Sequence, residues 1–268
     1  FNVSVQVFAF KAGTTNPGSA VASAMELRTN ATGASAFEGT NDFATTVYMP
    51  SALCLFNGVQ TSSYAVQNTT DASVTVSVNY DSGVVDGPYT LAPGAKRSFN
   101  ACDGGNAAGY IGSAVIEASG DVVAMGKVFG GGLSTAFLGF TSGASKVALP
   151  YVRWTTAHWY DGTRQRAFIA IQNVGADLPA GAVTVKYYDK AGVLVGTDTL
   201  GAIPSGAKVN SNAGNIGAAE FGYYTDGTFG GSAIVEGPAG SALAVIVRIQ
   251  TRVGSTSVAE DYSGIAIQ

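Results

Sequence analysis

The sequence predicts an all-β protein made of two tandem β-sandwich domains that follow an N-terminal strand segment. Three observations support this prediction: apolar and polar residues alternate with period two, turn-forming residues recur at short intervals, and short strings repeat in the same order along the 268 residues. Alternation with period two is typical of a strand that buries one face. Many short strands separated by turns favour a sandwich of the immunoglobulin-like or jelly-roll-like kind.

Residues 1–46 are expected to form the N-terminal strand segment. Ala36-Phe37 and Gly39 fall one hundred residues before Ala136-Phe137 and Gly139, so the segment repeats the closing strands of a domain. Because a strand without its sheet is not stable alone, the segment must complete the first domain or add to a sheet edge of a neighbouring copy. The alternating apolar face for that contact consists of Phe1, Val3, Val5 and Val7.

Residues 47–146 are expected to form the first sandwich domain. In the run Val74–Tyr80, valines alternate with polar residues, as in a strand with one buried face. Turn signals such as Asp86-Gly-Pro88 separate runs of this kind. The string GSAVIE, at Gly112–Glu117, is interpreted as another strand, in which glycine permits close backbone approach or a bulge.

Residues 147–268 repeat these strings in order and are expected to form the second domain. GSAVIE returns as GSAIVE at Gly231–Glu236, and a single repeat unit therefore explains both halves of the chain. The other matched pairs are Ala65–Asn68 with Ala170–Asn173, Pro93–Lys96 with Pro204–Lys208, and Ala124-Met125 with Ala244-Val245.

The most distinctive stretch is the loop from Trp154 to Tyr160, which holds both tryptophans and the only histidine of the chain. Trp and Tyr offer large contact area at low entropic cost, so they suit stacking on a sugar or on a partner protein. The other interpretation, which we favour, is that these aromatic residues fill the junction between the domains. The candidate residues for a binding or interdomain loop are Trp154, His158, Trp159 and Tyr160.

The two cysteines, Cys54 and Cys102, are either small buried apolar residues or one disulfide. Neither lies in a CxxC string or beside a histidine, so a metal site has little support. Cys102 lies in a glycine-rich polar turn that offers no apolar pocket to a free thiol, which favours the disulfide and an oxidising compartment. Sequons that could accept a glycan begin at Asn2, Asn30 and Asn68.

Composition and motifs exclude several functions. The net charge of −4 and the lack of clustered Lys and Arg argue against a nucleic-acid partner. No apolar run approaches the roughly 20 residues that cross a bilayer. The chain has no GxSxG string for a nucleophile and no DxDxDG loop for calcium. We therefore expect no catalytic residue, no enzymatic activity, no metal and no cofactor.

The order of the strings resembles the tandem β-sandwich repeats of secreted bacterial surface and filament proteins. The strings are Leu149-Pro150, Ile171–Asn173, Val183–Asp189 and Gly231–Glu236. The resemblance implies export and a structural or adhesive role, and it supplies no catalytic residue.

The repeat and the resemblance together predict an extracellular structural subunit of a filament or surface layer. Its partners would be copies of itself in head-to-tail contact, because contacts of that kind do not close. The alternative is a monomeric secreted adhesin or carbohydrate-binding module that uses the Trp154–Tyr160 loop on glycans or a cell surface. The alternating N-terminus is unlike a signal peptide, so we expect a mature chain from which the signal peptide has been removed.

Overall fold

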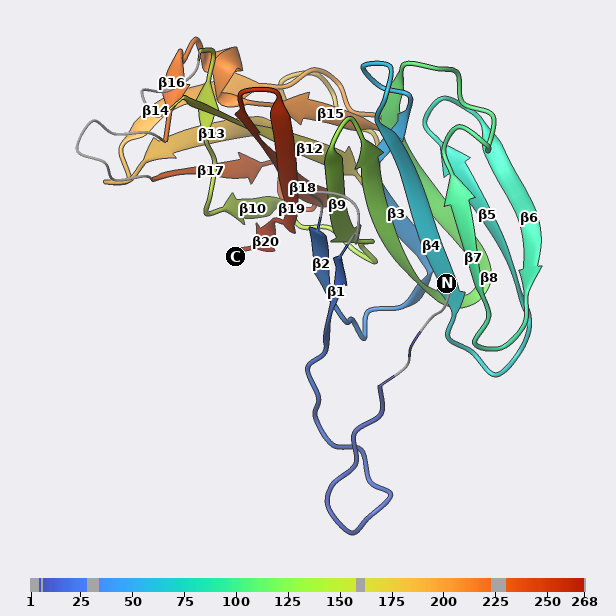
Figure 1. Cartoon of the computed structure of the whole chain (residues 1–268). Coiled ribbons are helices and arrows are strands. Elements are labelled where there is room, and N and C mark those ends of the chain that lie inside the picture. The colour runs from blue at the N-terminus through green and yellow to red at the C-terminus, as the bar shows by residue number, and fades with distance from the viewer. Residues whose placement is uncertain (1–4, 6, 28–33, 158–161, 223–229, 268) are drawn as a thin grey trace.

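The computed structural model describes residues 5, 7–27, 34–157, 162–222 and 230–267, and strands make up nearly all of its regular structure (Figure 1). The helix present in this part of the chain is one 3₁₀ turn, η1 (Ala213–Ile216). No helix in the described part is long and apolar enough to cross a membrane. The predicted all-β class is therefore confirmed.

Seven strands of the first half, residues 44–138, form one sheet that curls around the long strand β8 (Tyr110–Gly130). The first part of β8 pairs with β3 and β5, and its second part pairs with β4 and β9. One strand of 21 residues thus contributes to both layers of a sandwich-like arrangement. The other strands are β3 (Ala44–Cys54), β4 (Thr61–Asn68), β5 (Val74–Tyr80), β6 (Val85–Leu91), β7 (Lys96–Asn100) and β9 (Leu133–Leu138).

The pairing of β8 changes partners around Gly120. The ladder with β5 ends at Ala118, and the ladder with β4 begins at Val122. A Cβ atom on Gly120 would lie 2.7 Å from Val74 Cγ1, so glycine permits the close approach that this bend requires.

The second half, residues 146–266, repeats this strand order with two separate sheets. One sheet has the order β14-β13-β17-β10-β20, and the other has the order β16-β11-β12-β18-β19, with β15 paired to β12. The strands are β10 (Lys146–Leu149), β11 (Trp154–Thr155), β12 (Thr163–Asn173), β13 (Thr184–Asp189), β14 (Leu194–Thr199), β15 (Lys208–Ser211), β16 (Glu220–Phe221), β17 (Gly231–Glu236), β18 (Leu243–Val253), β19 (Thr256–Ser263) and β20 (Ile265–Ala266).

Strands β17 and β18 occupy the places of the two parts of β8. Gly237-Pro238 follows β17 directly, and proline has no N–H to donate to a ladder, so the strand ends there. The predicted GSAVIE and GSAIVE strands are thus the start of β8 and the whole of β17.

The ladders also correct the alignment of the repeat. Ala65 lies opposite Met125, and Ala170 lies opposite Ile246. Met125 therefore corresponds to Ile246, and the match of Ala124-Met125 with Ala244-Val245 is wrong by one position. Short apolar strings tolerate such a slip in a sequence comparison, whereas a slip in a sheet moves every side chain to the other face.

Buried side chains form two clusters, one for each half. The first includes Val76, Tyr64 and Ile116, and the second includes Val185, Tyr187 and Ile169. Ala170 and Ile246 of the second half belong to the first cluster. The outer face of the β12–β18 sheet therefore packs against the first half.

Candidate assembly interface

The N-terminal segment contains a hairpin of β1 (Ser23–Leu27) and β2 (Ala34–Glu38). It has the same plan as the hairpins β8–β9 and β18–β19, which close the two halves. After each hairpin, the N–H of a glycine donates to a carbonyl of the first strand. These bonds are Gly39 N to Ala22 O (2.7 Å), Gly139 N to Ala124 O (2.9 Å) and Gly264 N to Val245 O (2.8 Å).

Strand β1 differs from its counterparts at its outer edge. In the two halves, β8 is flanked by β4 and β18 is flanked by β12. Within the described residues, β1 pairs only with β2. Unpaired N–H and C=O groups at a sheet edge are a template for another strand.

An ion pair docks the hairpin on the first half. Glu26 on β1 pairs with Lys127 on β8, and β2 contacts β9. Lys127 lies opposite Ala136 on β9, which offers no charge. Partial burial lowers the pKa of Lys127, because desolvation disfavours the charged ammonium.

The counterpart of Lys127 in the second half is Arg248, which finds its acid within its own hairpin. Arg248 lies opposite Asp261 on β19 and donates to both of its carboxylate oxygens, at 2.9 and 2.7 Å. The ladders place Ala136 opposite Lys127 and Asp261 opposite Arg248, but the sequence offset that aligns Lys127 with Arg248 aligns Ala136 with Ser257, so the sequence alone carries no signal of this difference. Sequence reasoning missed Glu26 as the replacement acid.

Residues 7–22 form an arm that extends away from the strands (Figure 1). Its regular pairing in the described part is one bridge, between Phe10 and Pro17. More than half of each large apolar side chain is exposed at Val5, Val7, Phe8, Phe10 and Val21. Clustered exposed apolar side chains mark contact surfaces in soluble proteins. Phe1 and Val3, the other predicted contact residues, lie outside the described residues.

The structure places Trp154 in the core of the second half. Its side chain is buried, its ring centroid lies 5.8 Å from that of Phe168, and the Arg166 guanidinium lies 4.9 Å above it. The prediction that Trp154 belongs to an exposed binding loop or to the interdomain junction is therefore wrong: β11 pairs with β12 and β16, which hold the ring inside the sandwich. His158, Trp159 and Tyr160 lie outside the described residues.

Asn68 is buried at the end of β4 and serves the turn that follows. Its amide nitrogen donates to Ala72 O at 2.7 Å and Leu91 O at 3.1 Å, and its Oδ1 accepts from Thr70 N at 2.8 Å. A glycan on this nitrogen would displace these bonds, so Asn68 is not an acceptor in the folded protein. Asn2 and Asn30 lie outside the described residues.

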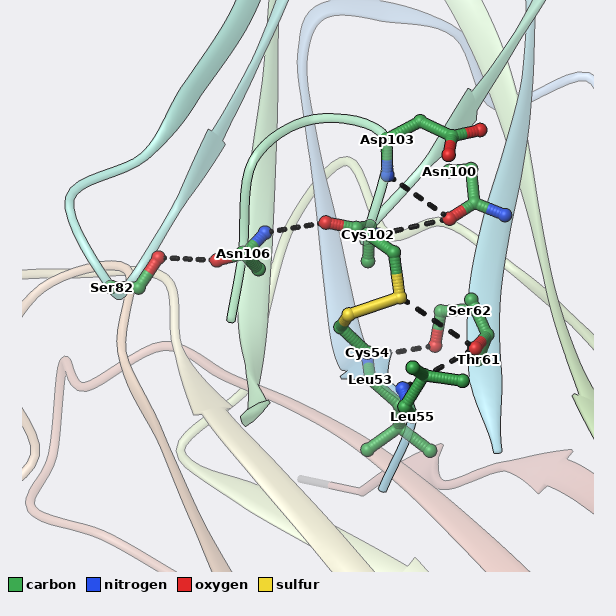
Figure 2. Close-up of a disulfide and its surroundings, with 11 residues drawn as sticks. Leu53, Cys54, Leu55, Thr61, Ser62, Ser82, Asn100, Cys102, Asp103 and Asn106 are labelled. Atoms are coloured by element: carbon green, nitrogen blue, oxygen red, sulfur yellow. Dashed lines mark hydrogen bonds between the residues drawn. A yellow bond between two sulfur atoms is a disulfide. The ribbon is translucent and has the colours of Figure 1, made fainter. Parts of the chain in front are cut away.

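Cys54 and Cys102 form a disulfide, as predicted (Figure 2). It links the end of β3 to the turn after β7, and polar side chains hold both segments. Leu53 N donates to Ser62 Oγ at 3.0 Å, and Cys102 N donates to Asn100 Oδ1 at 2.9 Å. The bond is compatible with an oxidising, extracellular compartment.

Comparisons with known proteins identify no family. No protein-family model and no curated protein match the sequence. Among solved structures, a calcium-binding mutant of Bacteroides uniformis beta-glucuronidase 2 is similar over 76% of this chain and 24% of that chain, with 12% identity and a TM-score of 0.17. A TM-score this low supports no statement about fold or function.

Proposed function

We propose that the protein is a structural subunit of an extracellular filament or surface layer, assembled by β-strand addition between copies. The observation that carries the proposal is the edge of β1 that has no partner strand among the described residues, beside an arm with exposed apolar side chains. A strand from the arm of another copy would satisfy the backbone of the β1 edge and remove apolar surface from water.

In this proposal the chain comprises two tandem β-sandwich domains, residues 47–146 and 147–268, and residues 1–46 are the assembly segment. The matching strand orders of the halves support the division, as do their separate buried clusters. Each half also has its own closing hairpin, so neither needs residues 1–22 to complete a sheet.

The arm is large enough to hold a contact. Burying Val5, Val7, Phe8 and Phe10 would contribute about 6–12 kcal/mol before association costs of roughly 4–15 kcal/mol. Each added ladder hydrogen bond would contribute about 1 kcal/mol net. The gain and the cost are of similar size, so assembly would depend on both the apolar residues and the paired backbone.

The geometry favours an open assembly. The arm and the β1 edge are different surfaces of one copy, so a contact between them is heterologous. Repeated heterologous contacts that do not close produce filaments. An extracellular location agrees with the disulfide.

Deleting residues 1–10 tests the proposal. The truncated protein should keep its melting temperature and its β-sheet circular dichroism, because the paired strands begin later in the chain. Assembly should be lost, as measured by electron microscopy and light scattering. A truncated protein that still polymerises, or one that is unfolded, would contradict the proposal.

A matched pair of substitutions separates the arm from general surface effects. Val7 and Val193 are exposed to 61% and 59%, and Val193 lies on the turn between β13 and β14. Val7→Asp should abolish assembly, whereas Val193→Asp should leave it intact.

Native protein that is monomeric and binds a glycan array would instead support the secreted adhesin or carbohydrate-binding module.

A further inference from the structure

A cavity of about 210 Å³ lies where the outer face of the β12–β18 sheet meets the first half. Buried Leu53, Ala170 and Ile246 form part of its wall, together with Phe56 and Phe168. Exposed polar residues, including Asn57 and Asn210, also line it. A mainly apolar wall with a few polar groups is typical of sites for small molecules.

Lys208 is the charged side chain of this cavity that forms no hydrogen bond or ion pair with a described residue. It begins β15, and no described residue accepts a hydrogen bond from its ammonium. The pKa of Lys208 is lowered to about 7, mainly by burial and also by the nearby Arg248, whereas Asp81 acts in the opposite direction. The positive charge of the Lys208 ammonium is therefore only weakly balanced by its surroundings.

The neighbouring charges are already engaged. The carboxylate of Asp261 neutralises Arg248 through two hydrogen bonds. Asp81 accepts hydrogen bonds from Tyr110 at 2.5 Å and from Ser113 N and Oγ at 2.9 and 3.0 Å. Both carboxylates therefore have other partners, and the cavity offers one cation to a ligand.

We propose that this cavity binds a small molecule with an apolar body and a single carboxylate, which pairs with Lys208. An apolar cavity of about 150 Å³ holds benzene. A cavity of about 210 Å³ therefore suits a molecule slightly larger, such as benzoate or hexanoate. A carboxylate is favoured because a charge-assisted bond to an ammonium is strong at a partly buried site.

The repeat supplies a matched control lysine. Lys96 begins β7 as Lys208 begins β15, and they lie opposite Gln67 and Gln172, respectively. Lys96 is not among the residues that line the cavity. The match of the two lysines was visible in the sequence, but the cavity over one of them was not.

Calorimetric titration of the full chain with benzoate, hexanoate and the neutral isostere benzamide tests the site. Benzoate should bind the wild type and Lys96→Met equally, and Lys208→Met at least tenfold more weakly. Benzamide should bind the wild type and Lys208→Met alike. Equal benzoate affinity in Lys208→Met, or no binding of either carboxylate at millimolar concentration, would overturn the proposal.

The pH dependence gives a second readout. Between pH 7 and 9 the affinity for benzoate should fall towards tenfold per pH unit, because the complex requires the protonated amine. The other charged groups near the site are Asp81, Asp261 and Arg248, and burial raises the pKa values of the nearby Tyr64 and Tyr110. An affinity for benzoate that does not change with pH would count against the ion pair.

A substitution that fills the cavity gives a third test of the proposal. Ala170→Leu places additional carbon atoms in the wall and should abolish binding of benzoate and benzamide, with circular dichroism used to check that the variant is folded. If Ala170→Leu binds both molecules as the wild type does, the site lies elsewhere and the proposal fails.

Discussion

Trp154 stabilises the second core through contacts with Arg166, Phe168 and Gly214. Arg166 stacks over one face and is itself fixed by hydrogen bonds to Thr155 O and Thr156 O, at 2.9 and 3.0 Å. A Cβ atom on Gly214 would lie 2.8 Å from the ring, so η1 also packs closely against it. Substitution at this position should therefore affect folding more than ligand binding.

Trp154→Ala is expected to lower the free energy of unfolding by about 3–5 kcal/mol, because it leaves a large cavity in the core. Phe43→Ala, at a side chain that is 52% exposed, should change it by less than about 0.5 kcal/mol. Chemical denaturation followed by fluorescence and circular dichroism measures both. Equal stability of the two variants would show that Trp154 is not a core residue.

Lys208 should make stability depend on pH. An unfolded lysine holds its proton up to about pH 10.5, whereas folded Lys208 loses it near pH 7. The unfolded state therefore binds more protons between these values, and the free energy of unfolding should rise with pH through this window. Below pH 7 both states are protonated, so this contribution no longer changes with pH.

Denaturation of Lys208→Met at pH 7 and pH 9.5 should lack the part of that rise due to Lys208, whereas Lys96→Met should retain that part and lose only the contribution of Lys96, whose pKa burial also lowers. The same rise in wild type and Lys208→Met would mean that Lys208 titrates normally. The two lysines occupy the same register position in the repeat, so the comparison isolates the effect of the cavity.

At the scale of elements, the disulfide ties β3 to the turn after β7 across a sequence separation of 48 residues. Closing a loop of this length removes entropy from the unfolded chain, worth about 4 kcal/mol in the chain-entropy model. Cys54→Ala with Cys102→Ala should lose about this much stability in guanidinium chloride. Free thiols that can be alkylated in the native wild type would contradict the bridge.

The closing hairpins show how one element can serve two roles. In β8–β9 and β18–β19 the first strand is paired on both edges, so each hairpin completes a sheet. The β1–β2 hairpin has the same closing hydrogen bond but keeps an open edge in the described part. The three hairpins share the same pairing and closing hydrogen bond. Because no described strand pairs with the outer edge of β1, the N-terminal hairpin is available for a contact.

At the scale of the whole molecule, the arm should be the first part of the chain that a protease removes. Lys11 is exposed in a turn of the arm, whereas Lys127 and Lys146 lie in paired strands. Brief treatment of the unassembled protein with trypsin should cleave after Lys11 and leave the two halves folded, as mass spectrometry would measure. Early cleavage after Lys127 or Lys146 would contradict the paired strands.

Assembly should change this cleavage selectively. If the arm adds to a sheet of another copy, Lys11 becomes protected while Lys190, exposed between β13 and β14, stays as sensitive as before. Unchanged cleavage at Lys11 in assembled material would argue against strand addition through the arm.

Local sequence was sufficient to predict the strands and the repeat. Alternation of valine with polar residues in Val74–Tyr80 reports burial of one face, which is a property of adjacent residues. The disulfide could be predicted because the chain offers a single pair of cysteines. The match between residues 1–46 and the closing strands predicted strands in the N-terminal segment for the same reason: turn and strand signals are short-range.

Contacts between distant segments set the rest, and no short string encodes them. The aromatic string around Trp154 resembles a binding loop until β12 and β16 enclose the ring. Glu26 became the partner of Lys127 because a hairpin one hundred residues away docks on β8. Lys96 and Lys208 follow the same Gly-Ala dipeptide and start equivalent strands, yet of the two only Lys208 lines the cavity between the halves. The sequence could not reveal this difference, because the desolvation of a side chain depends on what covers it in the fold and not on its neighbours in the chain.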